Sequence, residues 1–232
     1  MQEVPAALVE RFDLQAPWEV QAAQEEALPQ GFVYLDEAAP GILWDARYAT
    51  EDNFTGQVVP GYEANRIALS LEAVQGLIRA QAIAQEEGYQ LLVWDGARPQ
   101  RAVDWFVAWA QLPEDGRTRE EHYPNLDKSQ LMGEYVASRS GHSRGGSVDL
   151  TLLTLEGEAV DMGGSFDLMD PISHHGAKGI TQTQADNRAL LKQIMVQAGF
   201  EPYASEWWHY TLKDEPYPDT YFDFVRTGSP AS

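Results

Sequence analysis

Two stretches decide the fold and chemistry of this chain: Ser140-Gly141-His142-Ser143-Arg144-Gly145-Gly146-Ser147-Val148-Asp149 and, further along, Glu206-Trp207-Trp208-His209. Together they offer two imidazoles and one carboxylate, from His142, Asp149 and His209, as metal ligands. A catalytic zinc takes three protein ligands of these types and leaves its fourth position to water. Glu206 is then a spare carboxylate that could accept the proton of that water. The two stretches together therefore predict a catalytic zinc site.

The spacing within each stretch sets conditions on the local structure. On one regular strand, His142 and Asp149 would face opposite sides of a sheet. The Gly145-Gly146 turn between them allows His142 to lie on a loop and Asp149 to lie in the strand that follows. Glu206 must likewise precede the strand of His209 or lie at a bulge. Taken singly, each residue is better explained as a loop residue or surface charge, so the prediction depends on their combination.

Arg98 is a further candidate for the site. The apolar run 89–94 predicts a buried strand, and the turn Asp95-Gly96-Ala97-Arg98-Pro99 follows it directly. A guanidinium fixed in such a turn can stabilise the oxyanion that forms when water attacks a carbonyl. The alternative is an ordinary salt bridge from Arg98 to Asp95 or Asp104.

Apolar periodicity predicts the other elements. The helix that buries Leu190 and Ile194 is expected to be capped near Thr183 and to stop at Gly199. The loop 161–180 is long enough to cover a site. In all, we expect strands near 32–35, 42–44, 89–94, 148–152 and 208–212, and helices over 64–87, from Pro99 to before Pro113, and over about 128–138.

Composition bounds the class of protein. A chain of 232 residues with 44% hydrophobic residues can fill one domain, which we place at 31–228 after an N-terminal arm at 1–30. A formal charge of −20 argues against nucleic acid or anionic membrane as partners. The chain has no cysteine, and its first residues lack the pattern of a signal peptide. We expect a cytoplasmic protein, or a periplasmic one whose signal peptide has been removed.

The other histidines are weaker candidates for metal binding. His174 and His175 are adjacent, and adjacent side chains rarely bind one metal together, so a structural or lid role is favoured. His122 has no partner nearby in the sequence and is predicted to lie in a loop.

The chain resembles the zinc D-alanyl-D-alanine dipeptidases of the VanX type, in peptidase family M15, over about residues 40–225. Besides the two opening stretches, the segments that carry the resemblance are Tyr48-Ala49-Thr50, Asn53-Phe54-Thr55-Gly56, Gly61-Tyr62-Glu63, Asn65-Arg66, Trp94-Asp95-Gly96, Arg98-Pro99, Phe166-Asp167, Met169-Asp170 and Asp214-Glu215-Pro216-Tyr217-Pro218. Position 97 is Ala where that family usually has an aromatic residue, and position 141 is Gly where serine is expected.

The resemblance implies a fold and a reaction. The fold would be a single α+β domain of the Hedgehog/D-Ala-D-Ala peptidase type, with a central, mainly antiparallel sheet flanked by helices. The reaction would be zinc-dependent hydrolysis of the dipeptide D-Ala-D-Ala to two D-alanines, with one Zn²⁺ per chain. By position, the implied roles are zinc ligands for His142, Asp149 and His209, general base for Glu206, stabilisation of the tetrahedral intermediate for Arg98, and substrate binding for Tyr48, Ser140 and Asp167.

Three other functions stay open at this point. Two are peptidases of the same fold, a D,D-carboxypeptidase and an L-alanyl-D-glutamate endopeptidase. The third is a non-catalytic, zinc-stabilised module that binds wall peptides. The last is disfavoured because a structural zinc closes its fourth position and has no use for Glu206.

Overall fold

The centre of the molecule is a five-stranded sheet with the strand order β2-β4-β5-β7-β6, in a computed structural model that describes residues 27–228. β2 runs parallel to β4, and the other neighbouring pairs are antiparallel. The predicted α+β domain with a mainly antiparallel sheet is therefore confirmed. Of the predicted N-terminal arm, residues 1–26 lie outside the described residues. The strands are β2 (Leu43–Trp44), β4 (Tyr89–Asp95), β5 (Ser147–Thr154), β6 (Phe200–Pro202) and β7 (His209–Leu212).

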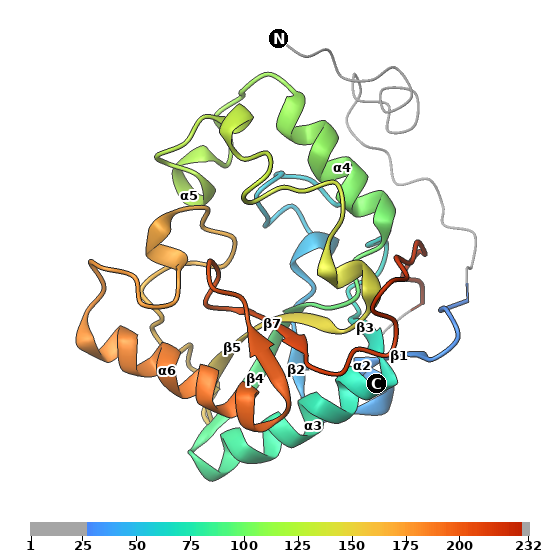
Figure 1. The fold of residues 1–232 in the computed structure, drawn as a ribbon, viewed down its shortest axis with the longest axis vertical. Helices are drawn as coiled ribbons and strands as arrows, with labels where there is room; N and C mark the ends of the chain where they lie inside the picture. The colour runs from blue at the N-terminus through green and yellow to red at the C-terminus, as the bar shows by residue number, and fades with distance from the viewer. Residues whose placement is uncertain (1–26, 229–232) are drawn as a thin grey trace.

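Two long helices cover one face of this sheet. α3 (Leu71–Glu86) and α6 (Gln182–Gln197) lie side by side below it in Figure 1. α3 approaches the sheet closely at Gly76, where an added methyl would lie 2.6 Å from the ring of Phe200. The opposite side carries α4 (Gln100–Gln111), the short helix α5 (Arg119–His122) and long connecting segments.

The remaining short elements border these layers. They are the helix α2 (Leu35–Ala38) and the 3-10 turns η1 (Arg47–Ala49), η2 (Lys128–Gln130), η3 (Gly141–Arg144) and η4 (Pro171–Ser173).

Alternation along β5 separates the core from the site. Val148, Leu150 and Leu152 are fully buried in the main hydrophobic core. Asp149 lies between them, so its side chain points to the opposite face of the sheet. Asp149 is also the register partner of His209 on β7 and of Asp95 on β4. Cross-strand partners on one face of a sheet are close neighbours, and the pairing therefore gathers these three polar side chains.

The predicted helix 64–87 begins later than expected. Residues Ala68–Ser70 form strand β3, which pairs antiparallel with β1 (Phe32–Tyr34) in a second, two-stranded sheet. Ser70 is extended and accepts a hydrogen bond from the backbone N–H of Ala73, so it caps α3. The apolar residues that predicted an earlier start of the helix belong instead to β3 of the second sheet.

Two other helix predictions were wrong in their bounds. Within 128–138 only the turn η2 is helical, because Gly133 has a φ of +96° and Met132 bridges to Val136. α6 is capped by Thr181 rather than Thr183. The Thr181 side chain accepts from the N–H of Gln184, and the Gln184 side chain accepts from the N–H of Thr181.

The segment that follows β7 packs against two turns that occur earlier in the chain. Phe222 accepts a backbone hydrogen bond from Gln100 and donates one to Ser143. Phe224 packs in a small cluster with Phe32 and Ala97. The C-terminal segment therefore contacts the turn that carries Arg98 and the 3-10 turn that carries His142.

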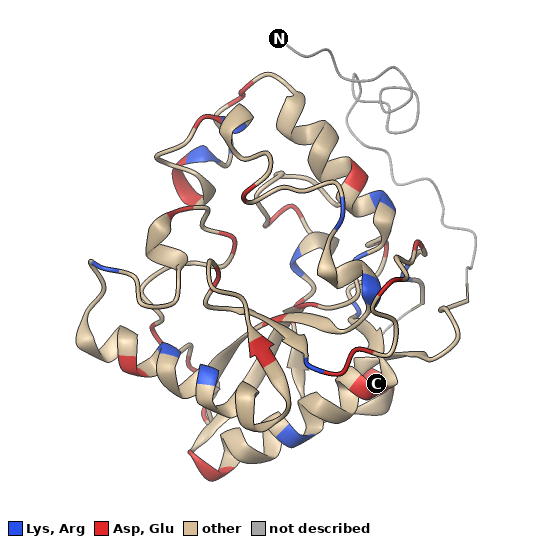
Figure 2. Ribbon diagram, in the orientation of Figure 1, with Lys and Arg blue, Asp and Glu red and all other residues tan. Residues whose placement is uncertain are grey.

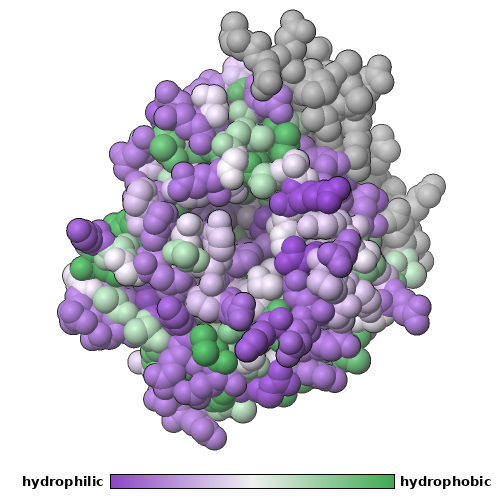
Figure 3. Space-filling view, in the orientation of Figure 1, coloured by the Kyte–Doolittle hydropathy of each residue, from purple (hydrophilic) through white to green (hydrophobic). Residues whose placement is uncertain are grey.

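The acidic residues are spread over many elements of the fold rather than gathered in one region (Figure 2). Asp and Glu occur on helices and loops alike (Figure 2), and the face in Figure 3 is mostly hydrophilic with small, separate apolar patches. Within residues 27–228, no helix combines the length and apolar character needed to span a bilayer.

Candidate active site

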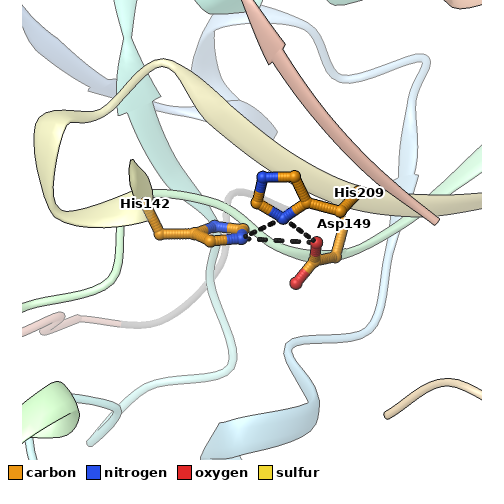
Figure 4. A group of neighbouring side chains, drawn as sticks. All are labelled: His142, Asp149 and His209. Atoms are coloured by element: carbon orange, nitrogen blue, oxygen red, sulfur yellow. Dashed lines mark hydrogen bonds and ion pairs between the residues drawn. The ribbon is translucent and has the colours of Figure 1, made fainter. Parts of the chain in front are cut away.

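His142, Asp149 and His209 bring three potential ligand atoms together above the sheet (Figure 4). His142 Nε2 lies 3.0 Å from His209 Nδ1 and 3.3 Å from Asp149 Oδ1, and His209 Nδ1 lies 3.1 Å from the same carboxylate oxygen. Ligands bound to one zinc at about 2.0–2.1 Å in a tetrahedron lie roughly 3.3 Å apart. The three atoms are thus close to the separations that a single metal ion requires.

The glycine turn places His142, as its spacing predicted. Ser140 is extended and its hydroxyl accepts from the His142 N–H at 3.2 Å, which caps η3. Gly145 ends η3 with a φ of +83°, and an added methyl there would lie 2.4 Å from the ring of Phe32. Only glycine combines this left-handed conformation with so close an approach. The turn therefore delivers His142 over the strand that carries Asp149.

The donor chemistry also fits a metal. His142 Nδ1 lies 2.8 Å from the carbonyl oxygen of Gly96, which fixes Nδ1 as the protonated nitrogen and leaves the Nε2 lone pair for a ligand. Burial raises the pKa of Asp149, but the two imidazoles more than offset this and hold it well below its usual value. Two histidines and one acidic side chain are a ligand set that mononuclear catalytic zinc sites use.

Glu206 lies beside this group and precedes β7, as its spacing from His209 required. Its Oε2 is 3.7 Å from His209 Nδ1. Burial raises the pKa of Glu206 to about 7. A carboxyl group with a pKa near neutrality can both accept and return a proton at physiological pH.

Arg98 forms a salt bridge with Asp95, the alternative to a catalytic role, and it also lines the site. Its Nε and Nη2 lie 3.0 and 2.9 Å from Asp95 Oδ2, and Nη2 is 3.5 Å from Asp149 Oδ2. Burial lowers the pKa of Arg98, but the Tyr48 and Asp95 side chains raise it by a larger amount. The pKa therefore lies above its usual value, and the guanidinium stays charged. Arg98 is thus held rigidly beside the metal ligands.

Tyr48 and Asp167 form a second polar pair in the same space. The Tyr48 hydroxyl donates to Asp167 Oδ2 at 2.6 Å, and both side chains are buried. Burial and the charge of Asp149 raise the pKa of Asp167 to about 7, although the Tyr48 hydrogen bond lowers it. Asp167 also has a φ of +57°, in the left-handed region that residues other than glycine seldom adopt. A paired carboxylate in a confined site is suited to a small cation.

All eight candidate residues line a single cavity of about 360 Å³. This volume is at the low end of the range for small-molecule sites, about 300–1,000 Å³. The fold brings these residues together from five segments that are separate in the sequence. The eight are Tyr48, Arg98, Ser140, His142, Asp149, Asp167, Glu206 and His209.

The other histidines lie elsewhere. His175 donates its backbone N–H to Ala204 and its ring packs against Tyr210, and neither His174 nor His175 is among the cavity-lining residues. His122 was predicted to lie in a loop, but it ends α5 and is buried. Its Nδ1 lies 3.3 Å from the carbonyl oxygen of Asp167, so it supports the loop that carries that residue.

The sequence did not predict the buried network behind Arg98. Asp95 is fully buried and accepts a 2.7 Å hydrogen bond from the Tyr62 hydroxyl in addition to its contacts with Arg98. Arg226, near the end of the described chain, also reaches Asp95. Nothing local in the sequence connects Arg226 with a turn more than a hundred residues earlier.

A candidate metal-binding cluster of two histidines and an aspartate, beside a further carboxylate in one cavity, is typical of the metal-dependent hydrolases. The comparisons with known proteins place the chain more closely. A family profile described as Peptidase_M15, D-ala-D-ala dipeptidase, matches residues 29–227. The chain belongs to this family of metallopeptidases.

Similar proteins carry the same description. The chain is 57% identical to a D-alanyl-D-alanine dipeptidase of Streptomyces coelicolor over 195 residues, which covers 83% of this chain and 96% of that protein. It is 54% identical to a D-alanyl-D-alanine dipeptidase of Enterococcus faecium, over 84% of this chain and 97% of the relative. It is 33% identical to one of Escherichia coli, over 82% and 91% of the two chains.

Proposed function

We propose that this chain hydrolyses the dipeptide D-alanyl-D-alanine to two D-alanines, with one zinc ion held by His142, Asp149 and His209. The observation that carries the proposal is the convergence of three ligand atoms, 3.0–3.3 Å apart, beside the carboxylate of Glu206 in a small cavity. The names of the similar proteins support the choice of substrate.

The chain's own residues divide the chemistry among them. A zinc ion, when bound, supplies a Lewis acid that polarises the scissile carbonyl and lowers the pKa of a water to about 7. Glu206 accepts the proton of the attacking water and returns it to the leaving amine. Arg98 holds a fixed positive charge where the carbonyl oxygen becomes negative.

The Tyr48–Asp167 pair selects a substrate with a free amino group. Asp167 is buried and accepts a hydrogen bond from Tyr48, so an ammonium group that reaches it adds a charge-assisted hydrogen bond to a carboxylate that has little contact with water. A peptide with a blocked amino terminus cannot supply that charge. This pair therefore favours a dipeptide over the longer peptides that a D,D-carboxypeptidase or an endopeptidase would cut.

One assay tests the proposal against the alternatives. Purified protein is incubated with free D-Ala-D-Ala and, separately, with its N-acetyl derivative, and released D-alanine is measured. We expect release from the free dipeptide only. Preferential cleavage of the N-acetyl compound would favour the carboxypeptidase, and binding without release from either compound would favour a non-catalytic module.

Removal of the metal should abolish activity and lower thermal stability. A metal at about 1,000 times its Kd stabilises the folded state by about 4 kcal/mol, and a domain of this size shifts by about 2–4 °C per kcal/mol. We therefore expect a chelator to lower Tm by roughly 10 °C. Calorimetry of the holo and apo forms and titration with Zn²⁺ check this, and full recovery of activity should require one ion per chain. Unchanged activity in verified apoprotein would contradict a catalytic metal.

Asp167→Asn should weaken selection for the free dipeptide. The change removes a charge-assisted hydrogen bond worth about 1.5–3 kcal/mol, so kcat/KM should fall by roughly 10- to 100-fold, mainly through KM. Because burial raises the pKa of Asp167 to about 7, its carboxylate is lost as pH falls through that value. The advantage of wild type over Asp167→Asn should therefore shrink from about pH 8 to about pH 6. A ratio independent of pH would remove Asp167 as the receptor of the ammonium group.

A further inference from the structure

Arg226 is a fully buried arginine whose position relative to the cavity suggests a role in the reaction. It belongs to the C-terminal segment that packs on the turn 95–99. Its Nη2 donates to the carbonyl oxygen of Ala97 and lies 3.5 Å from Asp95 Oδ1. Its Cζ lies 3.7 Å from the centre of the Tyr62 ring, a cation–π contact. Arg226 is not among the residues that line the catalytic cavity.

Asp95 connects Arg226 with Arg98. Asp95 Oδ1 faces Arg226 and the Tyr62 hydroxyl, and Oδ2 faces Nε and Nη2 of Arg98. One buried carboxylate is therefore shared by the buried guanidinium of Arg226 and the partly buried guanidinium of Arg98. In a low-dielectric interior such charges interact strongly, and the position of each depends on the others.

We propose that Arg226 is a positioning residue that acts through Asp95 and the Ala97 carbonyl to aim Arg98 at the reacting carbonyl. The proposal rests on the proposed function, in which Arg98 stabilises the developing oxyanion. Arg226 balances part of the negative charge of Asp95. Asp95 can therefore hold Arg98 in place without cancelling the positive charge that Arg98 presents to the substrate. By holding the carbonyl of Ala97, Arg226 also fixes the backbone that leads into Arg98.

Without Arg226, two changes should follow. Asp95 would keep Arg98 as its remaining arginine partner, beside His142 Nδ1 at 3.7 Å, and would draw the guanidinium away from the cavity. The backbone at Ala97 would also lose the donor that its carbonyl now accepts from. A displacement of even about 1 Å at a catalytic group can cost a large factor in rate. Binding of the dipeptide ammonium at Asp167 should be unaffected.

A double-mutant cycle on the zinc-loaded, full-length protein tests the proposal. Arg226→Met is measured alone and combined with Arg98→Ala, with D-Ala-D-Ala as substrate. We expect Arg226→Met alone to lower kcat about ten-fold and to change KM by less than about two-fold. In the Arg98→Ala background the same change should alter kcat by less than about two-fold. Equal losses in both backgrounds, or a change in KM alone, would overturn the proposal.

Arg66→Met is a matched control. Arg66 is also buried, forms an ion pair with Asp36, and lies over a tyrosine ring with its Cζ 3.5 Å from the centre of Tyr34. It also reaches the carbonyl oxygen of Thr227 in the same C-terminal segment, but it does not contact Asp95. This variant should lower Tm and leave kcat of the folded protein unchanged, whereas a ten-fold loss of kcat would overturn the specific role of Arg226.

Arg226→Lys keeps the proposal testable if Arg226→Met does not fold. Lysine retains the charge but not the planar fork of donors. We expect kcat about three-fold lower in the presence of Arg98 and no change in its absence, and loss in both backgrounds would overturn the proposal. Absence of dipeptidase activity in wild type would instead overturn the proposed function, so the two failures are distinguishable.

Discussion

Glu206→Gln is expected to lower kcat by about 10²- to 10⁴-fold, the range that a general acid–base group contributes. The substitution keeps the size and hydrogen-bonding capacity of the side chain but removes its ability to accept a proton. Glu206 Oε2 lies 3.7 Å from His209 Nδ1, at the edge of the three ligand atoms, so it is next to the place where water would be held. Burial, which raises its pKa to about 7, suits it to return the proton as well.

The zinc content of the variant shows whether Glu206 acts as a proton acceptor or as a metal ligand. Because His142, Asp149 and His209 already supply three ligand atoms, purified Glu206→Gln should keep one equivalent of zinc. Glu201→Gln is the control, since Glu201 is an exposed residue on the neighbouring strand β6 and undergoes the same chemical change. Single-turnover rates and metal analysis of both variants decide the matter. Near-normal kcat in Glu206→Gln would show that another group accepts the proton.

The sequence predicted that His142, Asp149 and His209 lie together, and the structure confirms this proximity, because part of their geometry depends on local rules. The glycine turn before Asp149 determines that His142 leaves the strand, and strand alternation determines the face on which Asp149 lies. What it could not predict is the register that pairs Asp149 with His209 and with Asp95. Register depends on hydrogen bonds between segments far apart in the chain. The eight site residues share one cavity because of that tertiary pairing.

The helix boundaries show the same limit. Apolar periodicity located α3 but extended it across residues 68–70, because a short strand and the first turn of a helix can carry similar apolar residues. The strand forms because β1, from a distant part of the chain, offers it a partner. β6 is only three residues long and has no periodicity to detect. The network of Asp95 and Arg226 is likewise a product of tertiary packing, since the C-terminal segment folds back onto the turn of Arg98.

Arg98→Ala is expected to lower kcat by about 10²- to 10³-fold with little change in KM, as for loss of an oxyanion-stabilising donor. Its described contacts with Asp95 and Asp149 use Nε and Nη2, and Arg98 also lines the cavity, so we expect Nη1 to be the donor that faces the substrate. Arg98→Lys should recover only part of the loss, because an ammonium group cannot bind Asp95 with two donors and also face the substrate.

The structure also predicts how Arg98→Ala differs from a general loss of stability. Asp95 keeps its hydrogen bond from Tyr62 and its contact with Arg226, so its buried charge retains a partner and the variant should fold. Arg117→Ala, at an exposed arginine paired with Asp115, is the control and should leave kcat unchanged. Steady-state kinetics with D-Ala-D-Ala, together with Tm and zinc content, distinguish the possibilities. A rise in KM at unchanged kcat would mean that Arg98 binds the ground state of the substrate and that the oxyanion is stabilised by other groups.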